Sequence, residues 1–192
     1  MRLHLADRRA YNHPSPEGGF TLIELLTVMA IMGILFTIGA FAVRQFWFVR
    51  ALSGSQDQVV VQLRQLQQRV IAETHPLVYG ARFMAGEDHF GLIRFDPDTN
   101  TCRQFQTVGL GTAVEVYAGT EISSDATEPS IFCKSNLTTL DGTSVPDAAT
   151  SEYAFFFARG NGTPGTIVVR SETLDRVESV EIAGVTGRVT EG

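Results

Sequence analysis

The longest uninterrupted apolar segment of the chain lies near its amino end. Residues 25–43 read LLTVMAIMGILFTIGAFAV, without a charged residue or a proline, and the run ends at Arg44. At about 1.5 Å of rise per residue, a helix of this length nearly spans a hydrocarbon core of about 30 Å. Extension back to Phe20 completes the span, so the pattern predicts a transmembrane helix over residues 20–43.

A second helical pattern follows the first. Between its aliphatic positions lie glutamines and arginines that suit a water-facing helix surface, and Pro76 predicts a helix end near Thr74. Residues 53–55, Ser-Gly-Ser, predict a weak point or kink. The sequence therefore predicts an amphipathic continuation of the helix over residues 44–75. The aliphatic positions at helical spacing are Val59, Leu63, Leu66 and Val70.

Beyond Pro76 the hydrophobic period changes from 3.6 residues to two, and glycine, proline and aspartate punctuate the chain. Many short strands at close spacing are typical of an antiparallel sandwich or a strongly curved sheet. The predicted fold class is α+β, with the long helix packed on a β domain over residues 76–192 and a loop over 141–151. The predicted strands are 77–83, 90–95, 101–106, 114–117, 130–133, 153–159, 166–170, 177–182 and 188–190.

Charge asymmetry predicts how the apolar run is oriented. Residues 1–19 contain three arginines, which the positive-inside rule keeps in the cytoplasm, so the body after Arg44 is expected outside the cytoplasmic membrane. Length and flanks alone leave alternatives: a signal peptide cut after the Ala-Phe-Ala of residues 40–42, a plain single-span anchor, or a buried core helix. The extreme amino-terminal position and the length disfavour the core helix.

Glu24 separates these alternatives. An ionised carboxylate in a membrane helix costs about 2.5–3.5 kcal/mol on insertion scales, and an inert anchor gains nothing from it. The charge becomes tolerable where a cation meets it at the same depth. A free amino group on Phe20, from the same helix or from a neighbouring subunit, supplies that cation only if the chain is cut before Phe20.

The residues around Glu24 carry a resemblance. Residues 18–26, GGFTLIELL, followed by the apolar run, closely resemble the cleavage and methylation signature of type IV pilin-like prepilins. The resemblance implies that a membrane-bound prepilin peptidase cuts after Gly19 and methylates the new amino terminus, Phe20, and that Glu24 serves in assembly. It also implies a filament of pilins or pseudopilins, an inner-membrane assembly platform, and a leader at residues 1–19. No cofactor and no enzyme activity are implied.

The carboxyl-terminal part resembles the GspH and FimT subfamily of minor pseudopilins and minor pilins. The resemblance lies in residues 155–169 and 180–189, which form a hairpin-like pattern rich in glycine and aliphatic residues. It implies a structural subunit of a type II secretion pseudopilus or of a type IV pilus, in the periplasm or at the cell surface. The alternative it implies is a tip adhesin, or a FimT-like subunit that binds DNA through a GRxR motif.

Net charge argues against the DNA-binding alternative. The chain carries −6, and removal of residues 1–19 would leave 12 basic and 19 acidic side chains, a body that repels phosphate backbones at long range. The motif here reads Gly187-Arg188-Val189-Thr190, which lacks the second arginine. Arg188 is thus the one candidate DNA contact, and nucleic acid is a disfavoured partner.

The two cysteines, Cys102 and Cys133, are too far apart for a CxxC motif. A free pair in a reducing compartment and a disulfide in an oxidising one both fit their number, and export of the body favours the disulfide. Closing such a loop contributes about 2–4 kcal/mol.

Other candidate chemistry is weak. Asp96, Asp98 and Asn100 alternate like the start of an EF-hand, but Thr101 replaces the required glycine and Thr107 the bidentate glutamate, so a β-turn explains them better. His75 and His89 have no ligand partner nearby in sequence and are expected at the surface or in turns. Phe155, Phe156 and Phe157 are expected in a core strand. No catalytic set and no metal site are predicted.

Overall fold

The structure of the protein is a computed structural model that describes residues 20–75, 77–118 and 128–192. The chain divides into two compact units, Met1–Ala42 and Val43–Gly192. The described part of the first unit is the beginning of helix α1 (Leu22–Ala72), and the second unit contains the rest of that helix and the β domain. Residues 53–55, the predicted weak point, lie inside α1.

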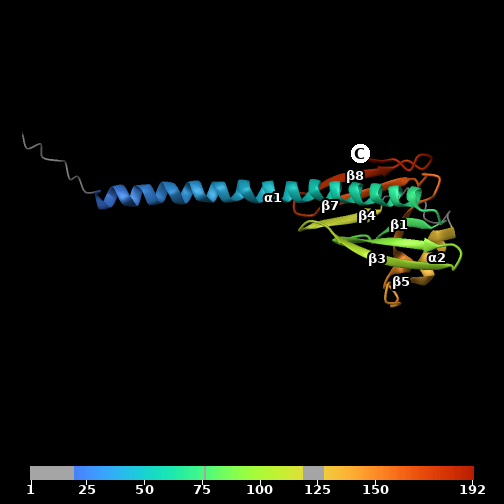
Figure 1. The fold of residues 1–192 in the computed structure, drawn as a ribbon. Helices are drawn as coiled ribbons and strands as arrows, with labels where there is room; N and C mark the ends of the chain where they lie inside the picture. The colour runs from blue at the N-terminus through green and yellow to red at the C-terminus, as the bar shows by residue number, and fades with distance from the viewer. Residues whose placement is uncertain (1–19, 76, 119–127) are drawn as a thin grey trace, which may run out of the picture. The chain divides into compact units, whose positions relative to one another are not determined.

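The second unit contains two β-sheets (Figure 1). The first sheet has the order β5-β3-β2-β1-β6, and its strands pair antiparallel except for β3 with β5. The second sheet has the order β4-β7-β8-β9 and is antiparallel throughout. The strands of the first sheet are β1 (Val78–Phe83), β2 (His89–Asp96), β3 (Thr101–Gly109), β5 (Leu137–Thr139) and β6 (Glu152–Phe156), and those of the second are β4 (Val114–Ala118), β7 (Gly165–Ser171), β8 (Arg176–Ile182) and β9 (Val189–Glu191).

The main core joins one stripe of α1 to both sheets. The predicted stripe is confirmed, because Val59, Leu63, Leu66 and Val70 are all at most 1% exposed. They pack in one cluster with Phe83 and Phe156 of the first sheet and with Ile167 and Ile182 of the second. Burying a large aliphatic or aromatic side chain of this kind contributes about 1.5–3 kcal/mol, so the stripe fixes the helix on the sheets.

Polar side chains of α1 add specific contacts to the second sheet. The Gln56 amide donates to the carbonyl of Ser179 at 2.8 Å, and the Arg64 guanidinium donates to the carbonyl of Val189 at 3.0 Å. Gln67 donates to the carbonyls of Gly160 and Thr186 at 3.1 and 3.0 Å. Arg64 thereby satisfies a backbone acceptor of the edge strand β9, where an open carbonyl would invite further pairing.

A smaller core covers the other face of the first sheet. It gathers Ile93, Phe95, Tyr153 and Phe155 with residues from α2 (Glu128–Asn136) and the 3-10 helix η2 (Ala148–Thr150). Both faces of β1 and β6 are therefore buried, and their sequences do not alternate between apolar and polar residues. The expected core position of Phe155 and Phe156 is confirmed, since both are 0% exposed, whereas Phe157 lies just beyond β6 and is only half-buried against the smaller core.

The predicted strand at residues 130–133 is wrong. This segment lies in α2, where Ser130 and Cys133 are both 0% exposed and Ile131 between them is 60% exposed. Burial three residues apart follows helical spacing, whereas a strand would place residues 131 and 133 on the same face. Four residues are too few to separate the two periods, which explains the error.

Other boundaries differ from the prediction in smaller ways. The predicted strand 153–159 ends as β6 at Phe156, because a turn follows in which Gly160 has φ 82° and donates to the carbonyl of Phe157 at 2.8 Å. Helix α1 ends at Ala72, two residues before Thr74. Strand β5 was not predicted, and its parallel pairing with β3 makes the first sheet mixed rather than purely antiparallel. The predicted loop at residues 141–151 contains the short helix η2.

Candidate functional site

The amino end of α1 is organised by a capping residue. Phe20 and Thr21 precede the helix, and the hydroxyl oxygen of Thr21 accepts the backbone N–H of Glu24 at 3.3 Å. The carbonyl of Thr21 accepts the N–H groups of Glu24 and Leu25 at 3.1 and 3.2 Å. Thr21 is therefore the N-cap, and Glu24 occupies the third helical position, which is the spacing of a capping box.

This position changes the electrostatic picture of Glu24. The side chain lies in the first turn of α1, where the helix dipole presents partial positive charge. Such placement favours a carboxylate by about 0.3–1 kcal/mol, which offsets part of the cost of holding the charge in a membrane. From the apolar run alone, Glu24 was interpreted only as an acid in a membrane helix. The Thr-x-x-Glu spacing that identifies the cap was present in the sequence and was missed.

The described part of the first unit presents apolar side chains in all directions. Leu22 is 82% exposed, Phe36 73% and Phe41 72%. Within the described residues, the length and composition of α1 are sufficient for it to cross a membrane, and its most apolar 18 residues have a mean hydropathy of 2.3. The hydroxyls of Thr27 and Thr37 donate to the carbonyls four residues earlier at 2.7 and 2.8 Å, so both donors are satisfied within the helix.

The predicted processing residues are only partly described. Phe20 is 84% exposed. Gly19 and the rest of the predicted leader lie outside the described residues. Phe20 and Glu24 are separated by about one helical turn, which brings a backbone group at residue 20 and the carboxylate to the same end of the helix.

Residues 14–40 match the family model described as the prokaryotic N-terminal methylation motif. The amino-terminal segment of the chain therefore carries this methylation motif. The match contains Phe20, Thr21 and Glu24, whose geometry is described above. It covers the amino-terminal segment, and the β domain lies outside it.

One solved structure is similar to this chain. It is the minor pseudopilin EpsH from the type 2 secretion system of Vibrio cholerae, with 13% sequence identity and a TM-score of 0.49. The alignment covers 73% of this chain and 95% of that chain. A comparison with curated protein sequences gives no match.

In the β domain, Cys102 and Cys133 form a disulfide. Their Cα atoms are 5.4 Å apart, and both residues are at most 1% exposed. The bond fastens α2 to the start of β3, next to the place where β5 pairs with β3. The covalent link and the packing of the smaller core therefore hold the same segment.

Arg188 lies on the turn between β8 and β9. Its side chain is exposed, and its backbone N–H is donated to the hydroxyl of Thr186 at 3.3 Å. The preceding Gly187 is buried with φ 59°, and a Cβ there would collide with the carbonyl of Gly160 and the amide of Gln67. Packing of the turn against α1 therefore explains this glycine without any role in DNA binding.

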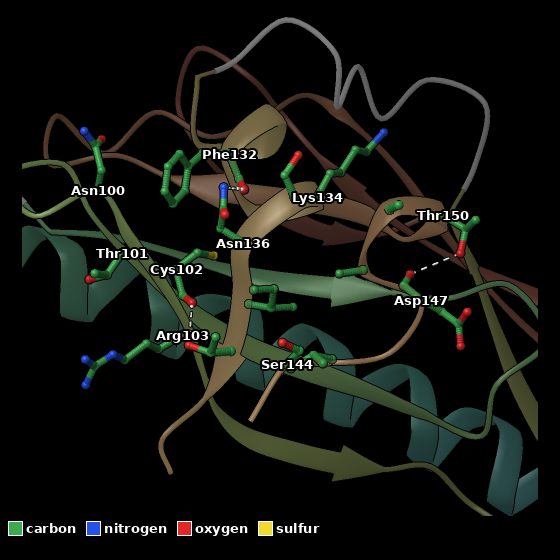
Figure 2. Close-up of a pocket in the computed structure, with 16 residues that line it drawn as sticks. Asn100, Thr101, Cys102, Arg103, Phe132, Lys134, Asn136, Ser144, Asp147 and Thr150 are labelled. Atoms are coloured by element: carbon green, nitrogen blue, oxygen red, sulfur yellow. Dashed lines mark hydrogen bonds between the residues drawn. The ribbon is translucent and has the colours of Figure 1, made fainter. Parts of the chain in front are cut away.

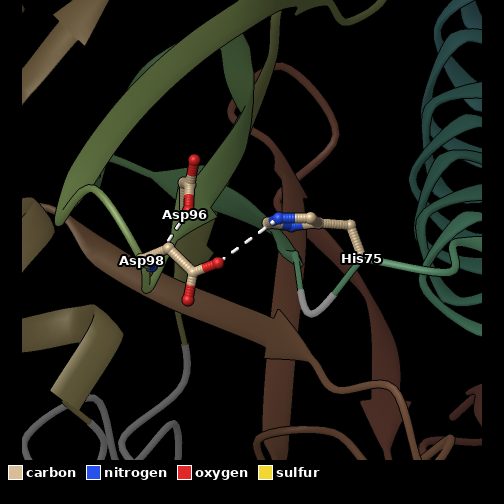
Figure 3. A group of neighbouring side chains, drawn as sticks. All are labelled: His75, Asp96 and Asp98. Atoms are coloured by element: carbon tan, nitrogen blue, oxygen red, sulfur yellow. Dashed lines mark hydrogen bonds and ion pairs between the residues drawn. The ribbon is translucent and has the colours of Figure 1, made fainter.

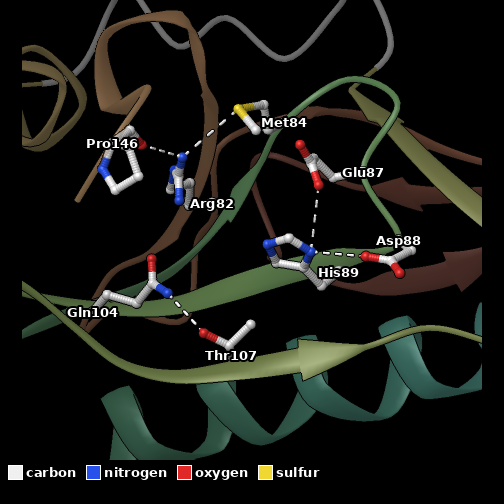
Figure 4. A network of polar contacts seen from close by, with 8 residues as sticks. All are labelled: Arg82, Met84, Glu87, Asp88, His89, Gln104, Thr107 and Pro146. Atoms are coloured by element: carbon white, nitrogen blue, oxygen red, sulfur yellow. Dashed lines mark hydrogen bonds and ion pairs between the residues drawn. The ribbon is translucent and has the colours of Figure 1, made fainter.

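The structure brings carboxylates to both histidines, which the sequence analysis did not foresee. The His75 ring nitrogen Nε2 lies 3.3 Å from a carboxylate oxygen of Asp98, and Asp96 is close by (Figure 3). His89 lies 2.9 Å from Asp88 and 3.5 Å from Glu87 (Figure 4). Both clusters lie at the surface, where such ion pairs contribute at most about 1 kcal/mol.

The expected β-turn at residues 96–100 is confirmed. The Asp96 carboxylate accepts the backbone N–H groups of Asp98 and Thr99 at 3.0 and 3.4 Å, which is an Asx-turn. Desolvation raises the pKa of the Asp96 carboxyl, but the hydrogen bonds from Thr99 and Asp98 outweigh it and hold that pKa below its usual value. These bonds favour the charged form of Asp96, which orders the turn.

A buried arginine fastens the loop before β6 to the first sheet. Arg82 of β1 is 8% exposed, and its guanidinium donates to the Ser151 hydroxyl and the Pro146 carbonyl, both at 2.7 Å. Figure 4 shows Arg82 and Pro146 beside the His89 cluster. Buried charges require such partners, so Arg82 has a structural role that strand patterning does not reveal.

A groove of about 670 Å³ lies between β3, α2, β5 and η2 (Figure 2). Hydrogen bonds between the residues that line the groove hold its walls. The Thr138 hydroxyl donates to the Cys102 carbonyl at 3.4 Å, and the Thr150 hydroxyl donates to the Asp147 carbonyl at 3.1 Å. The groove has one wall on the disulfide-linked segment, and its lining mixes amide, hydroxyl and apolar groups.

Proposed function

We propose that this protein is a structural subunit of a membrane-assembled filament. In this proposal a prepilin peptidase cuts after Gly19 and methylates the amine of Phe20, and Glu24 then directs assembly. The observation that carries it is the methylation motif over residues 14–40, with Glu24 in the first turn of a helix capped by Thr21.

Charge pairing supplies the assembly mechanism. A carboxylate in the hydrocarbon core costs about 2.5–3.5 kcal/mol, of which the helix dipole offsets a part. The protonated amine of Phe20 on a neighbouring subunit would neutralise the remainder when the two helices pack side by side with a fixed stagger. Methylation adds apolar surface to this amine and leaves it basic. The pair then sets the axial position of each subunit in the filament.

The proposal divides the chain into four segments. Residues 1–19 are the leader, residues 20–43 remain in the cytoplasmic membrane, and residues 44–75 continue the helix. Residues 76–192 form the extracytoplasmic body. The buried Cys102–Cys133 disulfide supports a body that folds outside the reducing cytosol. The partners are the peptidase, other pilins or pseudopilins, and the inner-membrane assembly platform.

The subunit is proposed as a minor component of either a type II secretion pseudopilus or a type IV pilus. This assignment rests on the resemblance of residues 155–169 and 180–189 to the GspH and FimT subfamily. The DNA-binding alternative is less well supported, because the turn packing of Gly187 explains the glycine of the GRVT sequence and the charge of the body is negative.

The amino terminus of the mature protein tests the proposal. Mass spectrometry of the chain purified from membranes should find N-methylated Phe20 as the first residue. A mature chain that starts at Val43 would identify an ordinary signal peptide cut after residues 40–42. A chain that keeps residues 1–19 would identify a plain membrane anchor, and either result would overturn the proposal.

A further inference from the structure

A belt of aromatic and arginine residues directly follows the apolar run. The sequence RQFWFVR occupies residues 44–50 of α1, and we call its members Arg44, Phe46, Trp47, Phe48 and Arg50 the 44–50 belt. The guanidinium carbon of Arg44 lies 5.6 Å from the ring centre of Phe48, and that of Arg50 lies 5.4 Å from the ring centre of Phe46. Both are cation–π pairs between residues four apart on the helix.

The belt does not belong to the core of the body. Trp47 is 66% exposed, Phe46 is 57% exposed and Phe48 is half-buried, and none of the three belongs to the main core cluster, whereas the stripe from Val59 to Val70 is at most 1% exposed at its aliphatic positions. Successive helical residues are about 100° apart, so Phe46, Trp47 and Phe48 point in three different directions. A packing stripe has its large side chains on one face, and this segment has them around the helix.

This arrangement fits the headgroup layer of a bilayer. Aromatic rings with a polar edge or a stacked cation concentrate there, because one end of the group favours the acyl boundary and the other the hydrated phosphates. The guanidinium groups of Arg44 and Arg50 carry donors that match phosphate oxygens while their stems cover the neighbouring rings. The uncharged run of residues 25–43 before the belt gives about 28 Å of helix, close to the hydrocarbon thickness.

We propose that the 44–50 belt binds the phospholipid headgroup layer on the extracytoplasmic side of the membrane and so sets the depth of the helix. The partner is the phosphate and glycerol region of the lipids, with Arg44 and Arg50 engaging phosphates. This inference rests on the membrane insertion in the proposed function, and it is independent of cleavage after Gly19. It also explains why two arginines are tolerated on the side where the positive-inside rule disfavours them.

The chain contains one tryptophan, Trp47, which makes the depth measurable without a label. The full chain is reconstituted into vesicles of phosphatidylethanolamine and phosphatidylglycerol, and Trp47 emission is quenched in three ways. The quenchers are lipids brominated just below the headgroup, lipids brominated near the chain ends, and aqueous iodide. The proposal expects the strongest quenching from the shallow lipid bromines, with a blue shift relative to tryptophan in water.

Variants identify the contribution of the guanidinium groups. The double variant Arg44→Ala/Arg50→Ala should move Trp47 toward the chain-end bromines, because the cations that hold it at the phosphates are gone. The matched control Arg103→Ala/Arg159→Ala removes two exposed arginines of the β domain and should leave the quenching profile unchanged. Circular dichroism of each variant verifies that the fold is retained.

Three results would overturn the proposal. Strong iodide quenching without lipid quenching would place Trp47 in water, and dominant chain-end quenching in the unaltered chain would place it in the hydrocarbon. Quenching that depends on protein density in the vesicles would assign the belt to contacts between subunits. None of these results changes the identity of the mature amino terminus. Failure of the headgroup-binding proposal is therefore distinguishable from failure of the filament assignment.

Discussion

The hydroxyl of Thr21 accepts the backbone N–H of Glu24 at 3.3 Å, which makes the second residue after the proposed cleavage point the N-cap of the helix that carries Glu24 in its first turn. One side chain thus fixes where α1 starts and, through that start, where the Glu24 carboxylate lies. Phe20, whose amine the proposed cleavage would free, is the residue immediately before this cap. The two charges proposed to pair between subunits are therefore held at a defined place on each helix.

Removal of the cap should loosen the helix start. Thr21→Ala deletes the hydroxyl and is expected to cost about 1 kcal/mol, which corresponds to roughly a fivefold faster exchange of the Glu24 amide hydrogen. Hydrogen exchange followed by nuclear magnetic resonance in detergent micelles measures it. Thr21→Ser is the matched control and should exchange like the unaltered chain, because serine caps at least as well as threonine. Equal exchange in all three chains would contradict the capping role.

Neutralisation of Glu24 should separate processing from assembly. Glu24→Gln keeps the side-chain shape and is expected to leave cleavage after Gly19 intact, while incorporation into filaments falls by at least about tenfold through loss of a desolvated charge pair. Fractionation of sheared filaments against membranes, with mass spectrometry of the amino terminus, measures both steps. Glu172→Gln changes an exposed turn carboxylate and should assemble normally. Normal assembly of Glu24→Gln would show that the charge pair does not direct it.

Loss of the disulfide should weaken the body. Cys102→Ser/Cys133→Ser removes the link between α2 and β3 and is expected to reduce the unfolding free energy by about 2–4 kcal/mol. Denaturant titration of the detergent-solubilised chain, followed by the circular dichroism of its β-sheets, measures the loss. The unaltered chain with a reducing agent should behave like the variant. A midpoint that neither treatment changes would show that the smaller core holds α2 without the bond.

The elements with long periodic patterns could be predicted from the sequence. The stripe from Val59 to Val70 spans three helical turns, so one period fits it and the buried face follows directly. Strands that pair as neighbours in a hairpin, such as β7 with β8, likewise carry their own alternation and turn residues. The N-cap at Thr21 could also have been predicted from the sequence, because its Thr-x-x-Glu spacing is a local pattern.

The remaining features depend on contacts that sequence patterns do not encode. Strand β5 has three residues and exists because β3 pairs with it beside the disulfide. Arg82 lies in a strand buried on both faces, and its partners Pro146 and Ser151 are more than sixty residues away. The pairing of His75 with Asp98 likewise arises only when the turn before β3 reaches the chain after α1. Long-range packing, and not local propensity, decides these places.

High pH should destabilise the body through Tyr153. This side chain is 0% exposed and its hydroxyl donates to the carbonyl of Ala148 at 2.8 Å. Burial, only partly opposed by the Arg82 charge, raises the pKa of Tyr153 from 10.0 to about 12. The fold therefore favours the neutral phenol. Its contribution to stability is complete below pH 10.0, where the unfolded chain is also neutral, and is lost as the pH rises toward 12.

The loss from this one group should reach about 2–3 kcal/mol at the upper end of that range. Denaturant titrations at a series of alkaline pH values compare the unaltered chain with Tyr153→Phe, in which the phenol cannot ionise. The variant should be less stable near neutral pH by about 1–3 kcal/mol, because the buried Ala148 carbonyl loses the shorter of its two hydrogen bonds and keeps only the one from the Ser151 N–H. Its stability should then fall less steeply with pH than that of the unaltered chain. The remaining tyrosines titrate in both proteins, so the difference between the two slopes isolates Tyr153, and parallel slopes would show that its ionisation is not coupled to folding.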